Sequence, residues 1–237
     1  MIVDHYLYLV ANLFALPMLL VFFFVAGPQR RAMAASGVVF MAWSVGAPLF
    51  DAYWSPARIG GLPVGIEDLL YCFQSGAGVW FWGSLADRRR LIVELRLRSV
   101  ATNTVMIAIP IAAGFAVLGA AGLDAITQSI IVLSVVVAVL LARAPWFWRV
   151  ALAASVGCTA NYILFLWALF AIWPDAAALW PATGLWTVRA LGIPIGEIPI
   201  AVIGPPAHAL IFAFVARARF VTPARTDEST LPTGLSE

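Results

Sequence analysis

Two short phrases decide how this chain is organised: residues 61–68 read GLPVGIED, and residues 192–197 read GIPIGE. Each spells Gly-apolar-Pro-apolar-Gly, with an acidic side chain within the next two residues, and each is followed by apolar sequence. Because Pro is tolerated in the first turn of a helix and Gly in the loop before it, the phrases predict two helix starts. That reading alone does not explain why an acid follows both times.

The segments around these phrases are apolar enough to lie in a membrane. Of the 237 residues, 63% are hydrophobic and only 11% are charged, and the mean hydropathy is +0.96. A water-soluble fold cannot cover so much apolar surface, whereas a bilayer core about 30 Å thick is crossed by about 20 helical residues. We predict an all-α membrane protein with seven transmembrane helices, near residues 7–27, 33–50, 66–86, 101–122, 126–142, 147–172 and 197–216.

Arginine carries all the side-chain positive charge, because the chain has fourteen Arg and no Lys. Only Arg58 and Arg189 fall on one side of the predicted helices. The other side holds Arg30, Arg31, Arg88, Arg89, Arg90, Arg96, Arg98, Arg143, Arg149, Arg217, Arg219 and Arg225. The positive-inside rule therefore predicts a multi-pass protein of the cell membrane, with the N-terminus outside and the C-terminus in the cytoplasm.

This orientation puts both phrases on the outer side and makes the first three and the last three spans run in the same direction. We predict two parallel three-helix repeats joined by a connector helix, a 3+1+3 arrangement, and such proteins hold their sites at the repeat interface. The units are residues 1–98, the connector 99–122 and residues 123–221, followed by a disordered cytoplasmic tail at 222–237.

Three acids stand in apolar surroundings and are the catalytic candidates: Glu67, Asp68 and Glu197. A charged carboxylate inside a bilayer costs about 3 kcal/mol or more unless it is paired or faces a cavity. The alternative, strongest for Asp68, is an acid at head-group level that stabilises a helix N-terminus. If Glu67 and Glu197 meet across the repeat axis, repulsion would keep one protonated and the other ionised, which supplies an acid and a base.

Helical spacing adds candidates to the faces of the two glutamates. Tyr71, Gln74 and Gly78 follow Glu67, and Ala201, Gly204 and His208 follow Glu197. Asp68 points about 100° away from Glu67 and is expected to support the acids. The substrate-binding candidates are Asp51, Trp54, Tyr71, Gln74, Gly78, Trp186, Gly204 and His208. The sequence also predicts that the last span is kinked or unwound by Pro199, Pro205 and Pro206.

The stretches GLPVGIEDLLYCFQSGAG and LGIPIGEIPIAVIGPPAHAL resemble the twin signatures of the lycopene cyclase domain family, the flavin-free integral-membrane cyclases, to which small meroterpenoid cyclases are similar. The likeness covers residues 1–220, including FDAYWSP at 50–56. It implies non-redox cyclisation of a polyisoprenoid, started by protonation, with acids at the positions of Glu67 and Glu197. Many carotene cyclases carry two adjacent acids two residues after the Pro, whereas here Gly65-Ile66 intervene and Glu197 stands alone. A shorter prenyl chain, free or on an aromatic head, is therefore at least as well supported as lycopene.

Other chemistries lack their residues. A retinal protein needs a Lys for its Schiff base, and the chain has none. A flavin or nicotinamide enzyme needs a Gly-rich turn after a strand, which is missing. The two His and two Cys are too scattered for a transition-metal site, and no Asp-rich cluster occurs for the magnesium of diphosphate-ionising enzymes. We expect no cofactor, no metal and no nucleic-acid partner, but a lipophilic polyprenyl substrate and membrane lipids, with a homo-oligomer left open. The alternative function is a small-solute transporter of the parallel-repeat type, with which Pro28-Gln29 shares a dipeptide. A third reading is a partner subunit without activity of its own.

Overall fold

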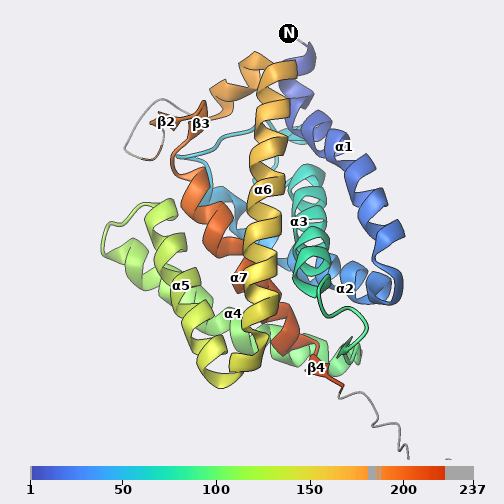
Figure 1. The fold of residues 1–237 in the computed structure, drawn as a ribbon. Helices are drawn as coiled ribbons and strands as arrows, with labels where there is room; N and C mark the ends of the chain where they lie inside the picture. Colours follow the sequence, from blue (N-terminus) through green and yellow to red (C-terminus); the bar gives the residue numbers. More distant parts are fainter. Residues whose placement is uncertain (1, 181–185, 187, 222–237) are drawn as a thin grey trace, which may run out of the picture.

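The structure, a computed structural model, describes residues 2–180, 186 and 188–221. The tail at 222–237, for which the sequence predicts disorder, lies outside these residues. Within them the chain forms seven α-helices and two small two-stranded sheets (Figure 1), which confirms the all-α prediction. The helices are α1 (Ile2–Val25), α2 (Arg30–Met41), α3 (Ile66–Ser84), α4 (Leu97–Ala120), α5 (Ala125–Arg143), α6 (Trp148–Ile172) and α7 (Glu197–Val215).

Six helical segments are long and apolar enough to cross a membrane. One of them joins η1 (Gly27–Gln29), α2 and the 3-10 helix η2 (Ala42–Phe50), so the second predicted span is a composite of helix types. The remaining helix, α3, is not among the six, and it carries Glu67, Asp68 and Gln74. The chain is therefore suited to a multi-pass membrane protein, and the long helix that falls short of the apolar character of a span is one that packs against four others.

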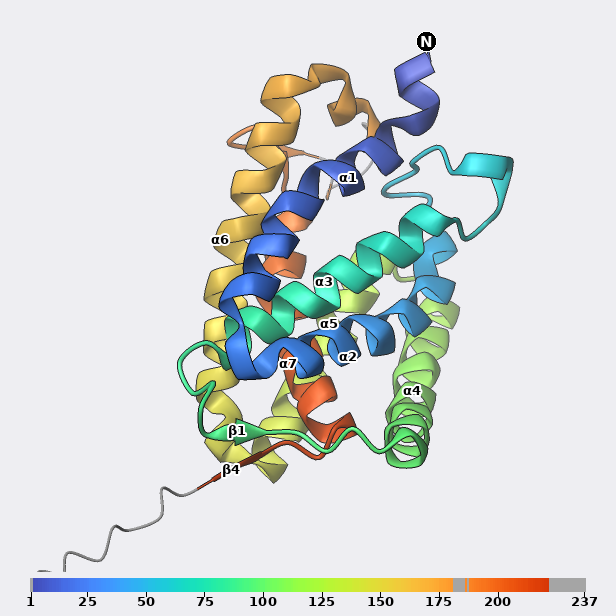
Figure 2. The same ribbon diagram turned by 90° about the vertical axis from the view of Figure 1, so that its right-hand side faces the viewer.

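Helices α3 and α7 form the centre of the bundle. The packing partners of α3 are α2, α6, α1 and α7, and those of α7 are α6, α5, α3 and α4 (Figures 1 and 2). Gly76 lets α3 approach α2 closely, because a Cβ there would stand 2.6 Å from the Cβ of Phe40. The Ser36 hydroxyl donates to the Gly76 carbonyl at 2.8 Å. Small residues and such hydrogen bonds are how membrane helices associate without a hydrophobic driving force.

The proline pair of α7 is compensated by its neighbour α6. Pro205 and Pro206 have no N–H, so the carbonyls four residues earlier, those of Ala201 and Val202, lose their partners within the helix. The Thr159 hydroxyl donates to the Ala201 carbonyl at 2.6 Å. The Ser155 hydroxyl donates to the Val202 carbonyl at 2.7 Å. Because α6 supplies both bonds, α7 is helical from Glu197 to Val215 and is not unwound, contrary to one alternative that the sequence left open.

At the lower end in Figure 2, β1 (Leu91–Ile92) pairs with β4 (Arg219–Phe220) and ties the loop after α3 to the end of α7. The Gln29 side chain also holds this loop, because its NH2 group donates to the carbonyls of Arg88 and Leu91 at 2.8 and 2.7 Å. Its oxygen accepts from the indole N–H of Trp80 at 3.1 Å. The buried Gln29 side chain is thus used by the fold itself.

At the other end of the bundle, each of the two quoted phrases leads the chain into the start of a helix. Before α7, β2 (Arg189–Ala190) and β3 (Ile193–Pro194) form a hairpin whose two turn residues, Leu191 and Gly192, have φ of 54° and 80°. Two-residue hairpin turns of this kind need such left-handed backbone. Before α3, the short η3 (Ile59–Gly61) reverses the chain. The first phrase thus starts at the last residue of a 3-10 turn and the second starts in a hairpin turn, and each leads to an acid in the first turn of a helix.

Candidate functional site

Glu67 is completely buried in the first turn of α3, and its carboxylate is turned back toward the loop before the helix. Oε1 accepts from the backbone N–H of Ile59 at 2.8 Å. Oε2 has no hydrogen-bond partner within the described residues. A Cβ on Gly65 would collide with this oxygen, so the second glycine of the first phrase makes room for the acid beside it.

Asp68 belongs to a buried ion-pair network with Arg58. Its Oδ2 accepts from the Arg58 Nε–H at 2.8 Å and from the Gly65 backbone N–H, also at 2.8 Å. Its Oδ1 accepts from the Tyr8 hydroxyl at 3.3 Å. The Arg58 Nη1 group also pairs with Asp51 at 3.0 Å. Asp68 therefore caps α3 and anchors the preceding loop, which is a structural task.

The charge of Arg58 is secured by its partners although the side chain is only 7% exposed. Burial by itself lowers the pKa of a guanidinium, but the hydrogen bonds and negative charges of Asp68 and Asp51 outweigh this effect and raise the pKa of Arg58. Because Arg58 is charged and pairs with both, the Asp51 and Asp68 carboxylates can lie close together near the start of α3.

Glu197 is the acid that faces the interior of the bundle. It is the first residue of α7 and is 8% exposed. Oε2 accepts from the Tyr162 hydroxyl of α6 at 2.5 Å, and Oε1 accepts from the Trp180 indole N–H at 2.7 Å. Two fixed donors thus hold both oxygens, so the direction in which the carboxyl group points is defined.

The second glycine of the second phrase has a steric role like that of Gly65. A Cβ on Gly196 would stand 2.7 Å from the Tyr53 hydroxyl and 3.0 Å from the Cβ of Trp186. Tyr53 lies close enough to Glu197 that burial and the negative charge of this acid both raise the pKa of Tyr53. In both phrases, a glycine next to the helix start makes room for the groups around an acid.

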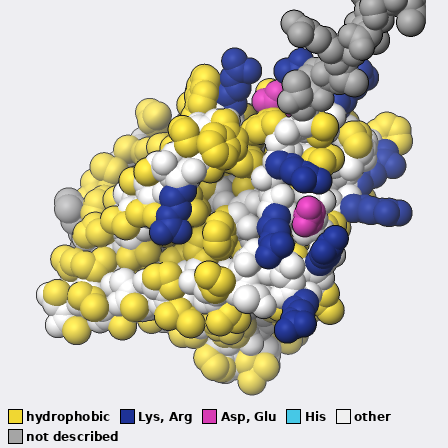
Figure 3. All heavy atoms as spheres, turned by 90° about the horizontal axis from the view of Figure 1, so that it is seen from below, with side chains coloured by type: hydrophobic (Ala, Val, Ile, Leu, Met, Phe, Trp, Pro, Cys, Tyr) yellow, Lys and Arg dark blue, Asp and Glu magenta, His cyan; other side chains and the backbone are white. Residues whose placement is uncertain are grey.

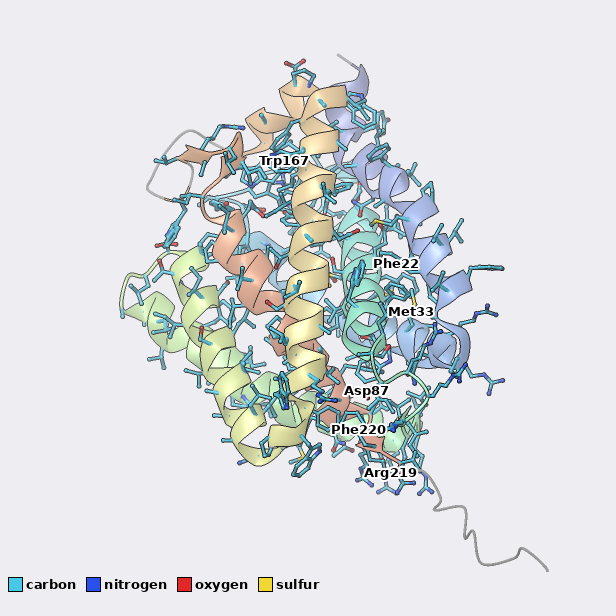
Figure 4. The ribbon with its side chains drawn as sticks, viewed as in Figure 1. Phe22, Met33, Asp87, Trp167, Arg219 and Phe220 are labelled. Atoms are coloured by element: carbon cyan, nitrogen blue, oxygen red, sulfur yellow. The ribbon has the colours of Figure 1, made fainter. Side chains whose placement is uncertain are left out.

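A cavity of about 180 Å³ lies between α1, α3, α6 and α7. Its walls are Ala15, Met18, Leu19, Phe22, Tyr71, Gln74, Ser75, Gly78, Val79, Trp82, Cys158, Asn161, Tyr162, Glu197, Ile200, Ala201, Gly204, Pro205 and His208. Figure 4 shows Phe22 on α1, on the side facing α3. An apolar cavity of about 150 Å³ holds one benzene, so this one takes a group about the size of a single ring.

The structure brings six of the eleven catalytic and substrate-binding candidates to this cavity. They are Tyr71, Gln74, Gly78, Glu197, Gly204 and His208. Gln74 also donates to the Asn12 carbonyl at 3.0 Å, which holds α1 against α3. The His208 ring packs edge-on against Phe40, with 4.0 Å between ring centroids. These residues come from the two central helices, so the faces of α3 and α7 meet around one space.

The other five candidates lie elsewhere. Glu67, Asp68 and Asp51 do not line the cavity, and no hydrogen bond or common partner joins Glu67 to Glu197 within the described residues. The shared proton expected for the two glutamates has no contact to support it, because the Ile59 amide holds Glu67 at the loop. Trp186 donates to the Thr127 hydroxyl at 3.2 Å.

Trp54, the fifth of these, stands between the two acidic regions. Its ring centroid lies 4.7 Å from that of Tyr8, which contacts Asp68, and 6.3 Å from that of Trp180, which binds Glu197. The Tyr71 ring is 6.1 Å away and belongs to the cavity wall. Aromatic packing therefore connects the Arg58 network to the Glu197 region without a hydrogen bond through Trp54.

Sequence reasoning missed the residues that hold the acids in place, chiefly Arg58, Tyr162 and Trp180. Tyr162 could have been found, because Thr159, Asn161 and Tyr162 put three polar groups within four residues of a largely apolar span. Arg58 stands seven residues from one acid of its network and ten from the other. Trp180 gives no such hint, since one Trp among ten is not distinctive.

No three His, Cys, Asp or Glu side chains in the described part of the chain are grouped so that they could ligate a metal ion. The groups available for chemistry at the cavity are the Glu197 carboxyl, the Tyr162 and Tyr71 phenols, the Cys158 thiol and the His208 imidazole. Comparisons of the chain with family models, with curated proteins and with solved structures gave no match.

Proposed function

We propose that this protein is an integral-membrane terpene cyclase, in which Glu197 starts a non-redox cyclisation by protonating a carbon–carbon double bond or an epoxide of a polyisoprenoid. One observation carries the proposal: a buried carboxyl group, held by two donors, lines an otherwise largely apolar cavity between four helices. A charged carboxylate is costly in such a place, and the neutral acid is the form that can donate a proton.

The proposed step balances without a co-reactant. The O–H bond of Glu197 breaks as a C–H bond forms at the less substituted carbon of the terminal double bond, and the π electrons of the alkene make the new bond, which leaves a tertiary cation. An internal double bond then attacks the tertiary cation, closes a six-membered ring and moves the positive charge along the chain. Loss of a proton from a neighbouring carbon gives a product that is an isomer of the substrate.

Residues around the cavity suit each stage. Phe22, Trp82 and Tyr71 line the cavity, and aromatic rings can stabilise a cation. Tyr162, hydrogen-bonded to Oε2, would hold the carboxyl group in position and stabilise the carboxylate left after proton transfer. His208 stands on the cavity wall as a candidate acceptor for the final proton. Glu67 has no part in this version of the mechanism.

The size of the cavity bears on the substrate. About 180 Å³ accommodates the ring-forming end of a prenyl chain but not a whole carotenoid. Helices α1 and α6 both contribute to the cavity wall but contact each other little, so the rest of the chain would extend between them into lipid. The proposal therefore covers linear terpenes, prenylated aromatic compounds and carotenoid end groups.

The 3+1+3 arrangement is part of the same proposal. Its support is that α3 and α7 are each third in their triplet, each begins after a Gly-apolar-Pro-apolar-Gly phrase with an acid in the first turn, and both lie at the centre of the bundle. The N-terminus would be outside and the C-terminus in the cytoplasm, as the distribution of arginines indicates.

The transporter alternative has less support. It drew on the Pro28-Gln29 pair, and the Gln29 side chain is occupied by the Arg88 and Leu91 carbonyls and the Trp80 indole. A carrier also needs a polar path to both faces of the membrane. The Glu197 cavity offers one acid against mainly apolar walls.

The test is product analysis in heavy water. Membranes containing the protein are incubated in D₂O with linear polyprenyl compounds, and the products are separated and weighed by mass spectrometry. We expect a cyclic product one deuterium heavier than its linear isomer, because the starting proton comes from solvent through Glu197. Glu197→Gln should abolish the product, and Tyr162→Phe should reduce its rate about a hundredfold, the lower range for a group that assists proton transfer.

The matched control is Glu94→Gln, a partly exposed acid whose Oε1 lies 3.9 Å from Arg219, outside the cavity. It should leave product formation unchanged. Undiminished product from Glu197→Gln with a normally inserted protein would end the assignment. Loss of activity in Glu67→Gln at full stability would instead restore the two-glutamate mechanism.

A further inference from the structure

A second cavity, of about 740 Å³, lies at the opposite end of the bundle from the two acidic helix starts. It is formed by α4, the end of α5, η4 (Pro145–Phe147), the end of α7 and β4. Figure 4 shows Arg219 and Phe220, two of its lining residues, at the lower end of the molecule. It shares no lining residue with the Glu197 cavity, so it needs an explanation of its own.

Three arginines line this cavity: Arg143, Arg217 and Arg219. Figure 3 shows how basic side chains gather on this end of the molecule. Among the described residues, the only ion pair of the three is a long one of 3.9 Å from the exposed Arg219 to the partly exposed Glu94, and such pairs contribute little. The wall itself contains no carboxylate. The cavity is therefore strongly positive.

Helix stabilisation does not account for all three. Arg143 is in the last turn of α5, where a cation interacts favourably with the helix dipole. Arg217 lies beyond the end of α7 with a φ of 46°, a backbone conformation usually given to glycine at this place. The Ala218 N–H closes the helix end on the Ala213 carbonyl at 2.7 Å, so the turn is well formed despite the arginine. An arginine where glycine is usual indicates that the Arg217 side chain has a task of its own at the cavity.

Apart from Asn103, whose side-chain NH2 donates to the Val215 carbonyl at 3.2 Å, the rest of the wall is apolar. Leu140 and Phe214 line the cavity beside the arginines, and Trp146, 59% exposed, stands at its edge. Exposed tryptophans are typical of the level of lipid head groups. A ligand that satisfies both parts of the wall needs an anionic head and an apolar chain.

We propose that this cavity binds the phosphate head group of a membrane amphiphile, with the arginines on the phosphate oxygens and the apolar chain along Leu140 and Phe214. Guanidinium groups bind phosphate with paired hydrogen bonds, and basic pockets between membrane helices on the cytoplasmic side bind such heads. The phosphate could belong to a phospholipid or to a prenyl diphosphate. The inference does not depend on the proposed cyclase activity.

Native mass spectrometry of the protein in neutral detergent tests the proposal with two pairs of probes. One pair is phosphatidylglycerol and phosphatidylcholine with the same acyl chains, and the other is farnesyl diphosphate and farnesol. We expect the anionic member of at least one pair to be retained about tenfold better, a difference of about 1.4 kcal/mol. Preference in the first pair assigns a phospholipid, and preference in the second assigns a prenyl diphosphate.

Two triple variants separate the cavity from general surface charge. Arg143→Gln, Arg217→Gln and Arg219→Gln together should abolish the preference. The matched control, Arg89→Gln, Arg96→Gln and Arg98→Gln, removes three exposed charges that do not line the cavity and should keep it. If the triple cavity variant does not fold, the single Arg143→Glu, at an exposed position, should still weaken retention. Equal loss in both triple variants, or no preference in either probe pair, would overturn the proposal.

Discussion

Replacing the Thr159 hydroxyl tests whether α6 really completes the hydrogen bonding of α7. Thr159→Val keeps the side-chain shape but leaves the Ala201 carbonyl without a donor, since Pro205 cannot supply one. An unsatisfied buried carbonyl costs about 1–3 kcal/mol, and side-chain hydrogen bonds between membrane helices are worth about 0.6–1.7 kcal/mol. We therefore expect a loss of about 1 kcal/mol in the free energy of unfolding, measured by reversible denaturation in mixed micelles.

The proline itself provides the decisive comparison. In a Pro205→Ala background, the restored N–H can bind the Ala201 carbonyl, so Thr159→Val should there cost no more than about 0.3 kcal/mol; a double-mutant cycle isolates this coupling. Thr104→Val is the matched control, because the Val100 carbonyl that Thr104 binds at 2.8 Å keeps its backbone partner within α4. Equal costs with and without Pro205, or an equal cost at Thr104, would refute the reasoning.

Two further perturbations follow from the helix starts. Arg58→Met should lower the free energy of unfolding by about 3 kcal/mol, because it leaves the buried Asp68 carboxylate uncompensated. Asp51→Asn, at a side chain 43% exposed, should cost only about 0.5 kcal/mol. Similar losses for both variants would contradict a buried ion pair between Arg58 and Asp68. Gly196→Ala should destabilise by about 1–3 kcal/mol, since its Cβ would overlap the Tyr53 hydroxyl. Gly46→Ala, with nothing within 4 Å, is its control, and thermal unfolding that is unchanged in both would show that the turn can relax.

Much of the fold could be predicted from apolar runs alone. All seven predicted spans overlap helices, and the limits of most differ by a few residues; for example, the span predicted at 101–122 is α4 at Leu97–Ala120. Helical spacing also identifies the residues of α3 and α7 that share a wall, since Gln74, Gly78, Gly204 and His208 all line one cavity. Spacing within a helix is a local property, so a single sequence reveals it.

The contacts of the acids could not be predicted in the same way. Glu67 lies one helical turn from Tyr71, yet its carboxylate is held by the Ile59 amide, because side chains in a first turn point back toward the chain before the helix. Glu197 depends on Tyr162 and on Trp180, which lie on two other elements. Which donor reaches which oxygen is decided by tertiary packing, and periodicity contains no information on it.

Gly78 of α3 and Gly204 of α7 both line the Glu197 cavity, and neither is closely crowded by another side chain. A methyl group added at Gly204 would meet no atom within 4 Å, and one at Gly78 would meet only Phe22, at 3.9 Å. Larger side chains at these two positions would grow into empty space. The size of the residues at these two positions would therefore set the volume of the cavity, while the surrounding helices keep their places.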